Sequence, residues 1–274
     1  MSLRINHNIS AMNTHRQLAK TDSMLSGSLE RLSSGLRVNR AADDSAGLAI
    51  SQRLRSQVEG LKMASQNAEQ AKNMVQTAEG FLGEIHNMLG RMRELAVQSA
   101  SDTVTSSDRA SLQSEFSSLR DEIDRIASAA QYNNMSLLDG TFTNQKFQIG
   151  PNGSTDNQIA ISITATDSGT LGIRNSAITD LNSAVSTIGE MDSAINKVSD
   201  SRSSLGTIQN RLAYTVASVD NASENLASSE STIRDLDISN EITNFTKSQI
   251  LVQAGMSMLA QANAVPQNVL ALFR

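Results

Sequence analysis

The three histidines are the side chains best suited to metal binding or acid–base catalysis, and their spacing favours neither. His7 and His15 lie eight positions apart, too far for the i, i+4 pair of a helical metal site, and His86 is remote from both. Asp43 and Asp44 lack the alternating oxygen ligands and the glycine of a calcium loop, so we interpret them as the start of a helix. The chain has no cysteine, no G-x-S-x-G, no Walker loop and no G-x-G-x-x-G. We therefore expect no catalytic site, no metal and no cofactor, and predict that the protein is not an enzyme.

Composition and charge argue against two further classes of function. The first 40 residues hold six basic and two acidic side chains, but no aromatic residue for base stacking, and the net charge of the chain is −5. We therefore expect no nucleic-acid binding. No apolar run approaches the ~20 residues of a membrane span, so we expect no membrane insertion. Only 3% of the residues are aromatic and two are prolines, a composition that favours long helices packed side by side.

Apolar residues recur every seven positions in two long segments, which predicts coiled-coil packing. In the first segment a second series follows three places later, and a third joins it from Met74. We expect one helix over 45–99 and interpret Gly80, Gly83 and Gly90 within it as points of close helix approach. The series are Leu61, Ala68, Val75, Leu82, Leu89 and Ala96; Ala64, Ala71, Ala78, Ile85 and Met92; and, in the second segment, Ala184, Met191, Val198, Leu205, Leu212, Val219 and Leu226, with Leu181, Ile188 and Ile195 as partners.

Between about 132 and 176 the period changes from helical to two. Phe147 and Ile149 alternate with polar residues, as do Ile159, Ile161 and Ile163, and the segment 151–153 (Pro-Asn-Gly) between them marks a turn. A shorter helical stripe precedes this region over 112–130. The expected fold class is therefore mainly α: an elongated antiparallel coiled-coil helical bundle with a small β-hairpin region in the middle of the chain.

Both ends of the chain carry apolar helical stripes. Ala11, Leu18, Leu25 and Leu32 are spaced by seven, and the predicted stripe near the C-terminus consists of Ile238, Ile242, Phe245, Gln249, Val252, Met256 and Leu259. Two amphipathic helices alone leave apolar surface uncovered. We therefore expect the ends to associate with other copies of the chain or with a partner protein.

Five segments of this sequence resemble the bacterial flagellin family. They are LRINHN at 3–8, RLSSGLRVNRAADDSAGLAI at 31–50, RELAVQ at 93–98, STIRD at 231–235 and AQAN with PQNVL over 260–270. The resemblance covers both ends and nearly all the predicted helices. About 46 residues separate the predicted helices that flank the hairpin region, which suggests a short form without variable outer domains.

The resemblance implies a structural subunit that self-assembles into the helical flagellar filament for bacterial motility. The terminal coiled-coil pair that forms the inner tube would be 1–40 with 232–274, and the rod domain would be 41–231. Implied partners are copies of the same chain, the flagellar type III export apparatus and an export chaperone, and the filament cap and hook-junction proteins. The implied location is a secreted, extracellular flagellum, with a periplasmic or a sheathed flagellum as the alternatives that the sequence leaves open. The expected assembly residues are Ile5, Ile9, Met12, Leu18, Leu25, Leu32, Phe245, Val252, Leu259 and Leu270.

Two further hypotheses concern recognition by a host receptor and an alternative function. In flagellins the rod face around RELAVQ is recognised by the flagellin-sensing Toll-like receptor of the host, so the resemblance implies Arg91, Leu95 and Glu115 as candidate contacts. The alternative function is a hook–filament junction protein or another non-polymerising coiled-coil interaction protein. Junction proteins resemble flagellins at their ends but differ in the segments matching 4–8 and 266–270, which here follow the flagellin pattern.

Overall fold

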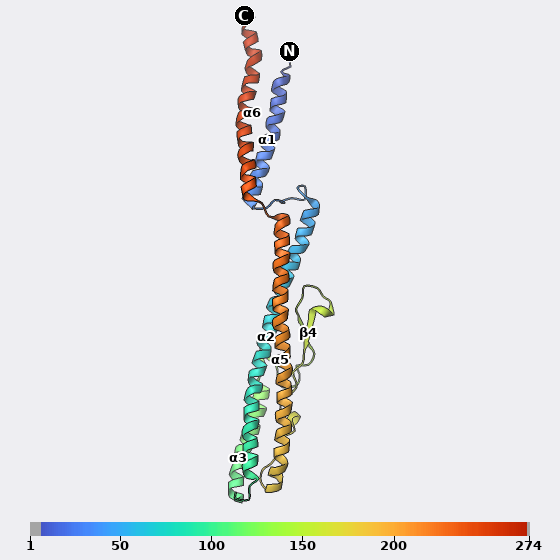
Figure 1. Cartoon of the computed structure of the whole chain (residues 1–274), viewed down its shortest axis with the longest axis vertical. Coiled ribbons are helices and arrows are strands. Elements are labelled where there is room, and N and C mark those ends of the chain that lie inside the picture. Colours follow the sequence, from blue (N-terminus) through green and yellow to red (C-terminus); the bar gives the residue numbers. More distant parts are fainter. Residues whose placement is uncertain (1–6, 273–274) are drawn as a thin grey trace. The chain divides into compact units, whose positions relative to one another are not determined.

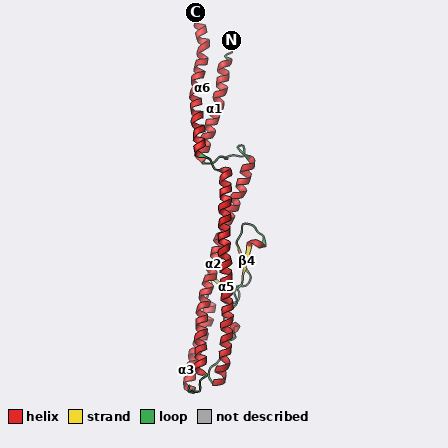
Figure 2. Cartoon of the chain, viewed as in Figure 1, coloured by secondary structure: helices red, strands yellow, loops and turns green. Residues whose placement is uncertain are grey.

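The computed structural model describes the backbone of residues 7–272 and the side chains of residues 7–264. The chain divides into two compact units: Met1–Ser56 with Asn225–Arg274, called the terminal unit below, and Gln57–Glu224, called the central unit. The elements are α1 (Ile9–Ser34), α2 (Ser45–Ser99), α3 (Ser106–Ala129), β1 (Gln131–Tyr132), β2 (Met135–Ser136), β3 (Gln145–Gln148), β4 (Gln158–Ile161), α4 (Ser168–Leu171), α5 (Leu181–Arg234) and α6 (Ile238–Leu272). Helices dominate and the strands are short (Figure 2), which confirms the mainly α prediction with a hairpin region.

The central unit is built around the predicted seven-residue series. In α2, the eleven positions of the first two series from Leu61 to Ala96 are all buried, and none is more than 7% exposed. In α5, the series from Ala184 to Val219 is buried as well. Its partner positions are Thr187 and Ala194, since the larger Ile188 and Ile195 of the prediction lie at the edge of the core. Small residues at these positions let the helix axes approach closely.

Ion pairs show the direction of the two long helices in the central unit. Arg93 on α2 contacts Asp192 on α5 at 2.6 Å, and Glu79 contacts Arg202 at 2.9 Å. Residue numbers rise along α2 as they fall along α5, so the helices are antiparallel. The shorter α3 adds Phe116 and Ile123 to the same core.

Two antiparallel hairpins lie between α3 and α4. The predicted one pairs β3 with β4, with Phe147 opposite Ile159, and its turn contains the Pro-Asn-Gly segment 151–153. The second pairs β1 with β2 and was not predicted. Its turn residues Asn133 and Asn134 both have positive φ, 47° and 64°, a conformation that asparagine tolerates better than most residues.

Helix α2 begins as predicted at the acidic pair, because the Asp44 carboxylate accepts a hydrogen bond from the Gly47 N–H at 2.8 Å. The interpretation of Gly80, Gly83 and Gly90 as points of close helix approach is wrong within the described chain. A methyl group added at any of the three would meet no neighbouring atom within 4 Å. These glycines weaken α2 without allowing a closer contact in the subunit.

Candidate assembly surface on the terminal helix pair

Helices α1 and α6 of the terminal unit run side by side in opposite directions (Figure 1). Near the start of α1, Asn8 donates a hydrogen bond from its side-chain amide to the carbonyl oxygen of Ala262 at 2.8 Å. In the middle, Leu18 lies over Gly255, where a Cβ atom would stand 3.1 Å from the leucine Cδ1. Near the end of α1, Arg31 Nε lies 3.3 Å from Glu241 Oε1. The two helices therefore form an antiparallel pair in register over most of α1.

The seam between these helices alternates large apolar residues with small or polar ones. The least exposed positions of α1 follow steps of three and four: Ala11, Thr14, Leu18, Thr21, Leu25, Ser28 and Leu32. Those of α6 do the same: Glu241, Phe245, Ser248, Val252, Gly255, Leu259 and Ala262. Six of the expected assembly residues, namely Leu18, Leu25, Leu32, Phe245, Val252 and Leu259, thus lie in the contact within one subunit. The small and polar half of each seam was missed, although its own seven-residue spacing is visible in the sequence.

The predicted α6 stripe coincides with the seam at Phe245, Val252 and Leu259, but its members Ile238, Ile242, Gln249 and Met256 lie outside the seam. Ile238, Ile242 and Met256 are 58%, 50% and 54% exposed, because Glu241, Ser248 and Gly255 take the seam positions instead. Helix α6 is apolar on more than one face, so periodicity alone does not identify the face that packs on α1.

The result is a helix pair that buries some large apolar side chains in its seam and leaves others facing outward. Ile9 and Met12, both expected assembly residues, are 57% and 60% exposed. One outward hollow of about 480 Å³ lies along α6 between Ile242 and Leu251, and another of about 600 Å³ lies beside Met12. The outward set is Ile9, Met12, Met24 and Leu29 on α1 with Ile238, Ile242, Ile250, Leu251, Met256 and Met258 on α6. Ile5 and the side chain of Leu270, also expected assembly residues, lie outside the described residues.

A short antiparallel β-bridge between Leu36 and Asp235 joins the two connections that lead away from this pair. Arg37 N–H donates to the Arg234 carbonyl at 2.7 Å, and Leu236 N–H donates to the Gly35 carbonyl at 3.0 Å. Gly35 has φ 70°, which ends α1 in the left-handed region. Because Leu36 follows α1 and Asp235 precedes α6, the bridge holds the end of α1 close to the start of α6.

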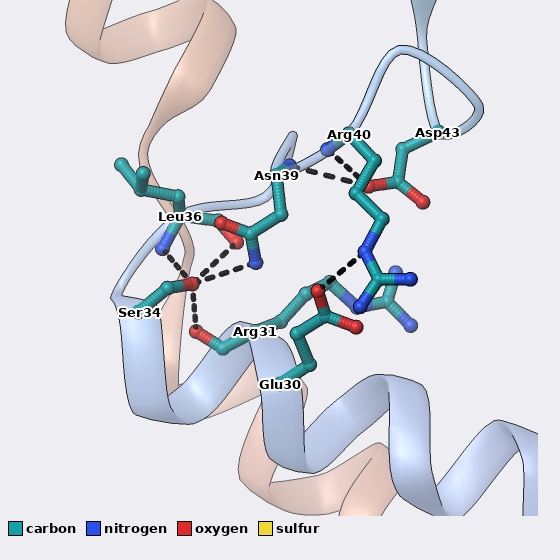
Figure 3. A network of polar contacts seen from close by, with 7 residues as sticks. All are labelled: Glu30, Arg31, Ser34, Leu36, Asn39, Arg40 and Asp43. Atoms are coloured by element: carbon teal, nitrogen blue, oxygen red, sulfur yellow. Dashed lines mark hydrogen bonds and ion pairs between the residues drawn. The ribbon is translucent and has the colours of Figure 1, made fainter.

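Polar side chains organise the loop that follows α1 (Figure 3). Asn39 donates from its side-chain amide to Ser34 Oγ at 2.7 Å, and Arg40 contacts Glu30 at 2.9 Å. The Asp43 carboxylate accepts hydrogen bonds from the backbone N–H groups of Arg40 and Asn39 at 3.0 and 3.2 Å. These bonds, that of Arg40 first, lower the pKa of Asp43 below its ordinary value.

The candidate receptor residues all lie in the central unit, but they do not form one exposed cluster. Arg91 contacts Glu115 at 2.9 Å and Glu94 at 3.1 Å, and its side chain is 49% exposed. Hydrogen bonds to Glu115 and then Glu94 raise the pKa of Arg91. Leu95 is 0% exposed because it belongs to the third apolar series of α2 and faces the core. The structure therefore contradicts Leu95 as a surface anchor and leaves the Arg91–Glu115 pair at the surface.

The described residues contain no group of three or more His, Cys, Asp or Glu side chains placed to hold a metal ion. His7 and His15 are exposed, and His86 is partly buried. Among the helices that the structure describes, none combines the length and hydropathy needed to cross a bilayer.

Comparison with known proteins places these helices in one family. The model of the bacterial flagellin N-terminal helical region matches residues 5–143, and that of the C-terminal helical region matches residues 188–273. The flagellin of Halalkalibacterium halodurans is 46% identical over 272 residues, covering 98% of this chain and 99% of that protein. The flagellin of Bacillus subtilis is 44% identical over 307 residues, covering 99% and 100%. The flagellar filament 33 kDa core protein of Treponema phagedenis is 44% identical over 286 residues, covering 98% and 99%.

Two solved structures share the fold. The crystal structure of Bacillus cereus flagellin has a TM-score of 0.51 and 30% identity, and covers 56% of this chain and 88% of that one. A protein of Vibrio parahaemolyticus described as flagellar hook-associated has a TM-score of 0.60 and covers 70% of this chain and 100% of that one, but at 14% identity it shows the fold alone. With both family regions matched and relatives aligned from end to end, this chain belongs to the bacterial flagellin family.

Proposed function

We propose that this chain is the structural subunit of the flagellar filament and that it polymerises with copies of itself for bacterial motility. Family membership supports this role. The observation that carries it to particular residues is the outward apolar surface of the α1–α6 pair, where ten large apolar side chains of the described residues are 48–62% exposed. Apolar surface on this scale marks an interaction site, and the occupant that a homopolymer supplies is another copy of the same pair.

The magnitude fits a surface that is used in assembly. Full burial of a large apolar side chain contributes about 1.5–3 kcal/mol, so covering the exposed half of ten such residues contributes on the order of 10 kcal/mol. Association costs roughly 4–15 kcal/mol in lost translation and rotation, before side chains are ordered. One helix pair therefore gains enough to join a polymer only if most of its outward face is covered.

The accompanying partners and location follow from the family. We propose export through the flagellar type III apparatus with an export chaperone, growth beneath the filament cap, and attachment through hook-junction proteins. We also propose that the filament lies outside the cell. Labelling intact cells with an impermeant amine reagent tests the location: an extracellular filament reacts, whereas a periplasmic filament reacts only after the outer layer is opened.

A pair of substitutions on α6 tests the assembly surface. Ile242→Ser with Ile250→Ser removes apolar surface from the outward hollow, and serine has nearly the helix propensity of isoleucine. A loss of about 2 kcal/mol would raise the critical concentration for salt-induced polymerisation about thirtyfold. The matched control is Thr243→Ser with Thr246→Ser, which removes two methyl groups from the lining of the same hollow. It should change the critical concentration less than threefold. Equal critical concentrations for the two variants would contradict the proposed surface.

Negative-stain microscopy separates this function from the junction-protein alternative. After salt-induced assembly, a filament subunit forms long tubes, whereas a junction or adaptor protein stays monomeric or forms short plugs. Deletion of 1–40 or of 232–274 should abolish the tubes, since each deletion removes one helix of the pair. Long tubes from either truncated protein would exclude the helix pair as the assembly element.

We also propose, from the family resemblance, that the exposed Arg91–Glu115 pair is recognised by the flagellin-sensing Toll-like receptor. Arg91→Ala should reduce the response of receptor-bearing cells to monomer at least tenfold. Arg125→Ala is the matched control, because Arg125 forms a comparable exposed pair with Glu122 at 2.6 Å. Leu95→Ala is unsuitable because it opens a cavity in the core. A wild-type monomer that gives no response at micromolar concentration would reject the recognition.

A further inference from the structure

Among the described residues of the terminal unit, four methionines are more than half exposed to solvent. Met12 and Met24 on α1 are 60% and 51% exposed, and Met256 and Met258 on α6 are 54% and 62% exposed. Met12 also lines the larger outward hollow. They make up four of the ten large side chains of the outward apolar set, so the surface proposed for assembly is rich in sulfur.

The methionines of the central unit provide an internal comparison. Met74, Met92 and Met191 are at most 1% exposed within the core. Met63 and Met135 are 56% and 44% exposed, but lie in the central unit. Oxidation of methionine follows access to the sulfur. Among the described residues, an unassembled subunit therefore presents two sets of exposed methionines, of which one lies on the α1–α6 pair.

We infer that Met12, Met24, Met256 and Met258 form an oxidation site at which a peroxide-class oxidant stops the unassembled subunit from polymerising. The thioether sulfur attacks one peroxide oxygen, the O–O bond breaks and an S–O bond forms. Sulfur loses two electrons to the peroxide, and the second oxygen leaves as water after taking up the remaining proton. The product is methionine sulfoxide, which a methionine sulfoxide reductase returns to the thioether while two thiols are oxidised to a disulfide and the oxygen leaves as water.

The consequence for assembly follows from the polarity of the product. A sulfoxide oxygen accepts hydrogen bonds, and burying it among aliphatic groups without a donor is unfavourable. The other six members of the outward set are all aliphatic: Ile9, Leu29, Ile238, Ile242, Ile250 and Leu251. The inference rests on the proposed function, since the sulfoxides are buried only if neighbouring copies cover this face. The same geometry makes the finished filament resistant to oxidation by peroxide, because neighbouring copies then cover the four sulfur atoms.

Peroxide treatment of the full-length protein tests the site in three forms: wild type, M12L/M24L/M256L/M258L and M63L/M135L. Each monomer is treated with hydrogen peroxide, mapped by peptide mass spectrometry and added to filament seeds. We expect seeded growth to slow at least tenfold for the wild type and for M63L/M135L, and less than twofold for the fourfold leucine variant. Treatment of the oxidised wild type with methionine sulfoxide reductase and thiol should restore growth. In assembled filaments the four methionines should oxidise at least tenfold more slowly than in the monomer.

Unchanged growth of wild-type monomer that carries all four sulfoxides would overturn the inference, as would equal inhibition of the fourfold leucine variant. If that variant does not polymerise before treatment, the reductase experiment decides: recovery supports the site, and no recovery overturns it. Untreated wild-type protein that forms no filament would instead overturn the proposed function and, with it, this inference.

Discussion

Replacing Arg31 with methionine would leave the Glu241 carboxylate in the α1–α6 seam without its counter-charge. Glu241 is 7% exposed, and Arg31 Nε lies 3.3 Å from its Oε1 without the alignment of a hydrogen bond. The arginine side chain is 39% exposed, so solvent screens the pair from one side. Methionine keeps the unbranched stem and the helix propensity of arginine, so the change removes mainly the charge.

The expected cost lies between that of an exposed and that of a buried ion pair. Removing the partner of a buried charged group costs about 1.5–3 kcal/mol, whereas an exposed ion pair contributes about 0–1 kcal/mol to stability. Glu241 also lies in the first turn of α6, where the helix N-terminus favours a negative charge and replaces part of the lost interaction. We therefore expect Arg31→Met to destabilise the seam by about 1–2 kcal/mol, which raises the critical concentration for seeded growth roughly fivefold to thirtyfold.

The assay is seeded filament growth at a series of monomer concentrations, with Arg40→Met as the matched control. Arg40 pairs with Glu30 at 2.9 Å, but the two side chains are 71% and 41% exposed, so its removal should change the critical concentration less than about threefold. Exchanging the charges, Arg31→Glu with Glu241→Arg, should recover part of the loss. An Arg31→Met effect no larger than that of Arg40→Met would refute the reasoning.

Three further outcomes are expected. Gly80→Ala and Gly83→Ala should each raise the free energy of unfolding by about 0.5–1 kcal/mol in thermal melts of the monomer, since the added methyl meets no atom within 4 Å; a lower melting temperature would show a hidden contact. Because the folded pKa of Asp43 lies below its ordinary 3.8, its ionised form stabilises the loop above that pH and the contribution is lost as the pH falls through the folded value. The protection factor of the Arg40 amide should therefore fall as the pH drops below 3.8 in the wild type but be low already at neutral pH in Asp43→Asn, and identical pH profiles of the protection factor would exclude this role. Amide protons of α1 and α6 should exchange quickly in the monomer and slowly in the filament, because a seam half made of small and polar residues stabilises an isolated pair weakly; equal protection would indicate a self-sufficient pair.

The sequence alone determined the central unit well, because there each helix buries one well-defined face. The series from Leu61 to Ala96 repeats every seven residues without interruption, and only helices packed along that face satisfy it. The Phe147–Ile163 alternation with its Pro-Asn-Gly turn likewise leaves one pairing. The hairpin at Asn133–Asn134 was missed because two-residue strands carry no periodicity, and only the paired asparagines indicate a turn with positive φ.

What the tertiary structure decided is which of several apolar faces meets which neighbour. Leu95 belongs to a third series that widens the apolar face of α2, and only the packed core shows that this series faces inward. On α6 the more hydrophobic residues are not the ones in the seam: Glu241, Ser248 and Gly255 face α1, while Ile242 and Met256 face outward. On α1, Leu18 lies so close to α6 that a small residue is favoured at Gly255, and the charge of Arg31 favours a carboxylate at Glu241. Both requirements come from the opposite helix. Periodicity along one helix contains no information about the other, so the division between seam and outward surface could be read only from the folded pair.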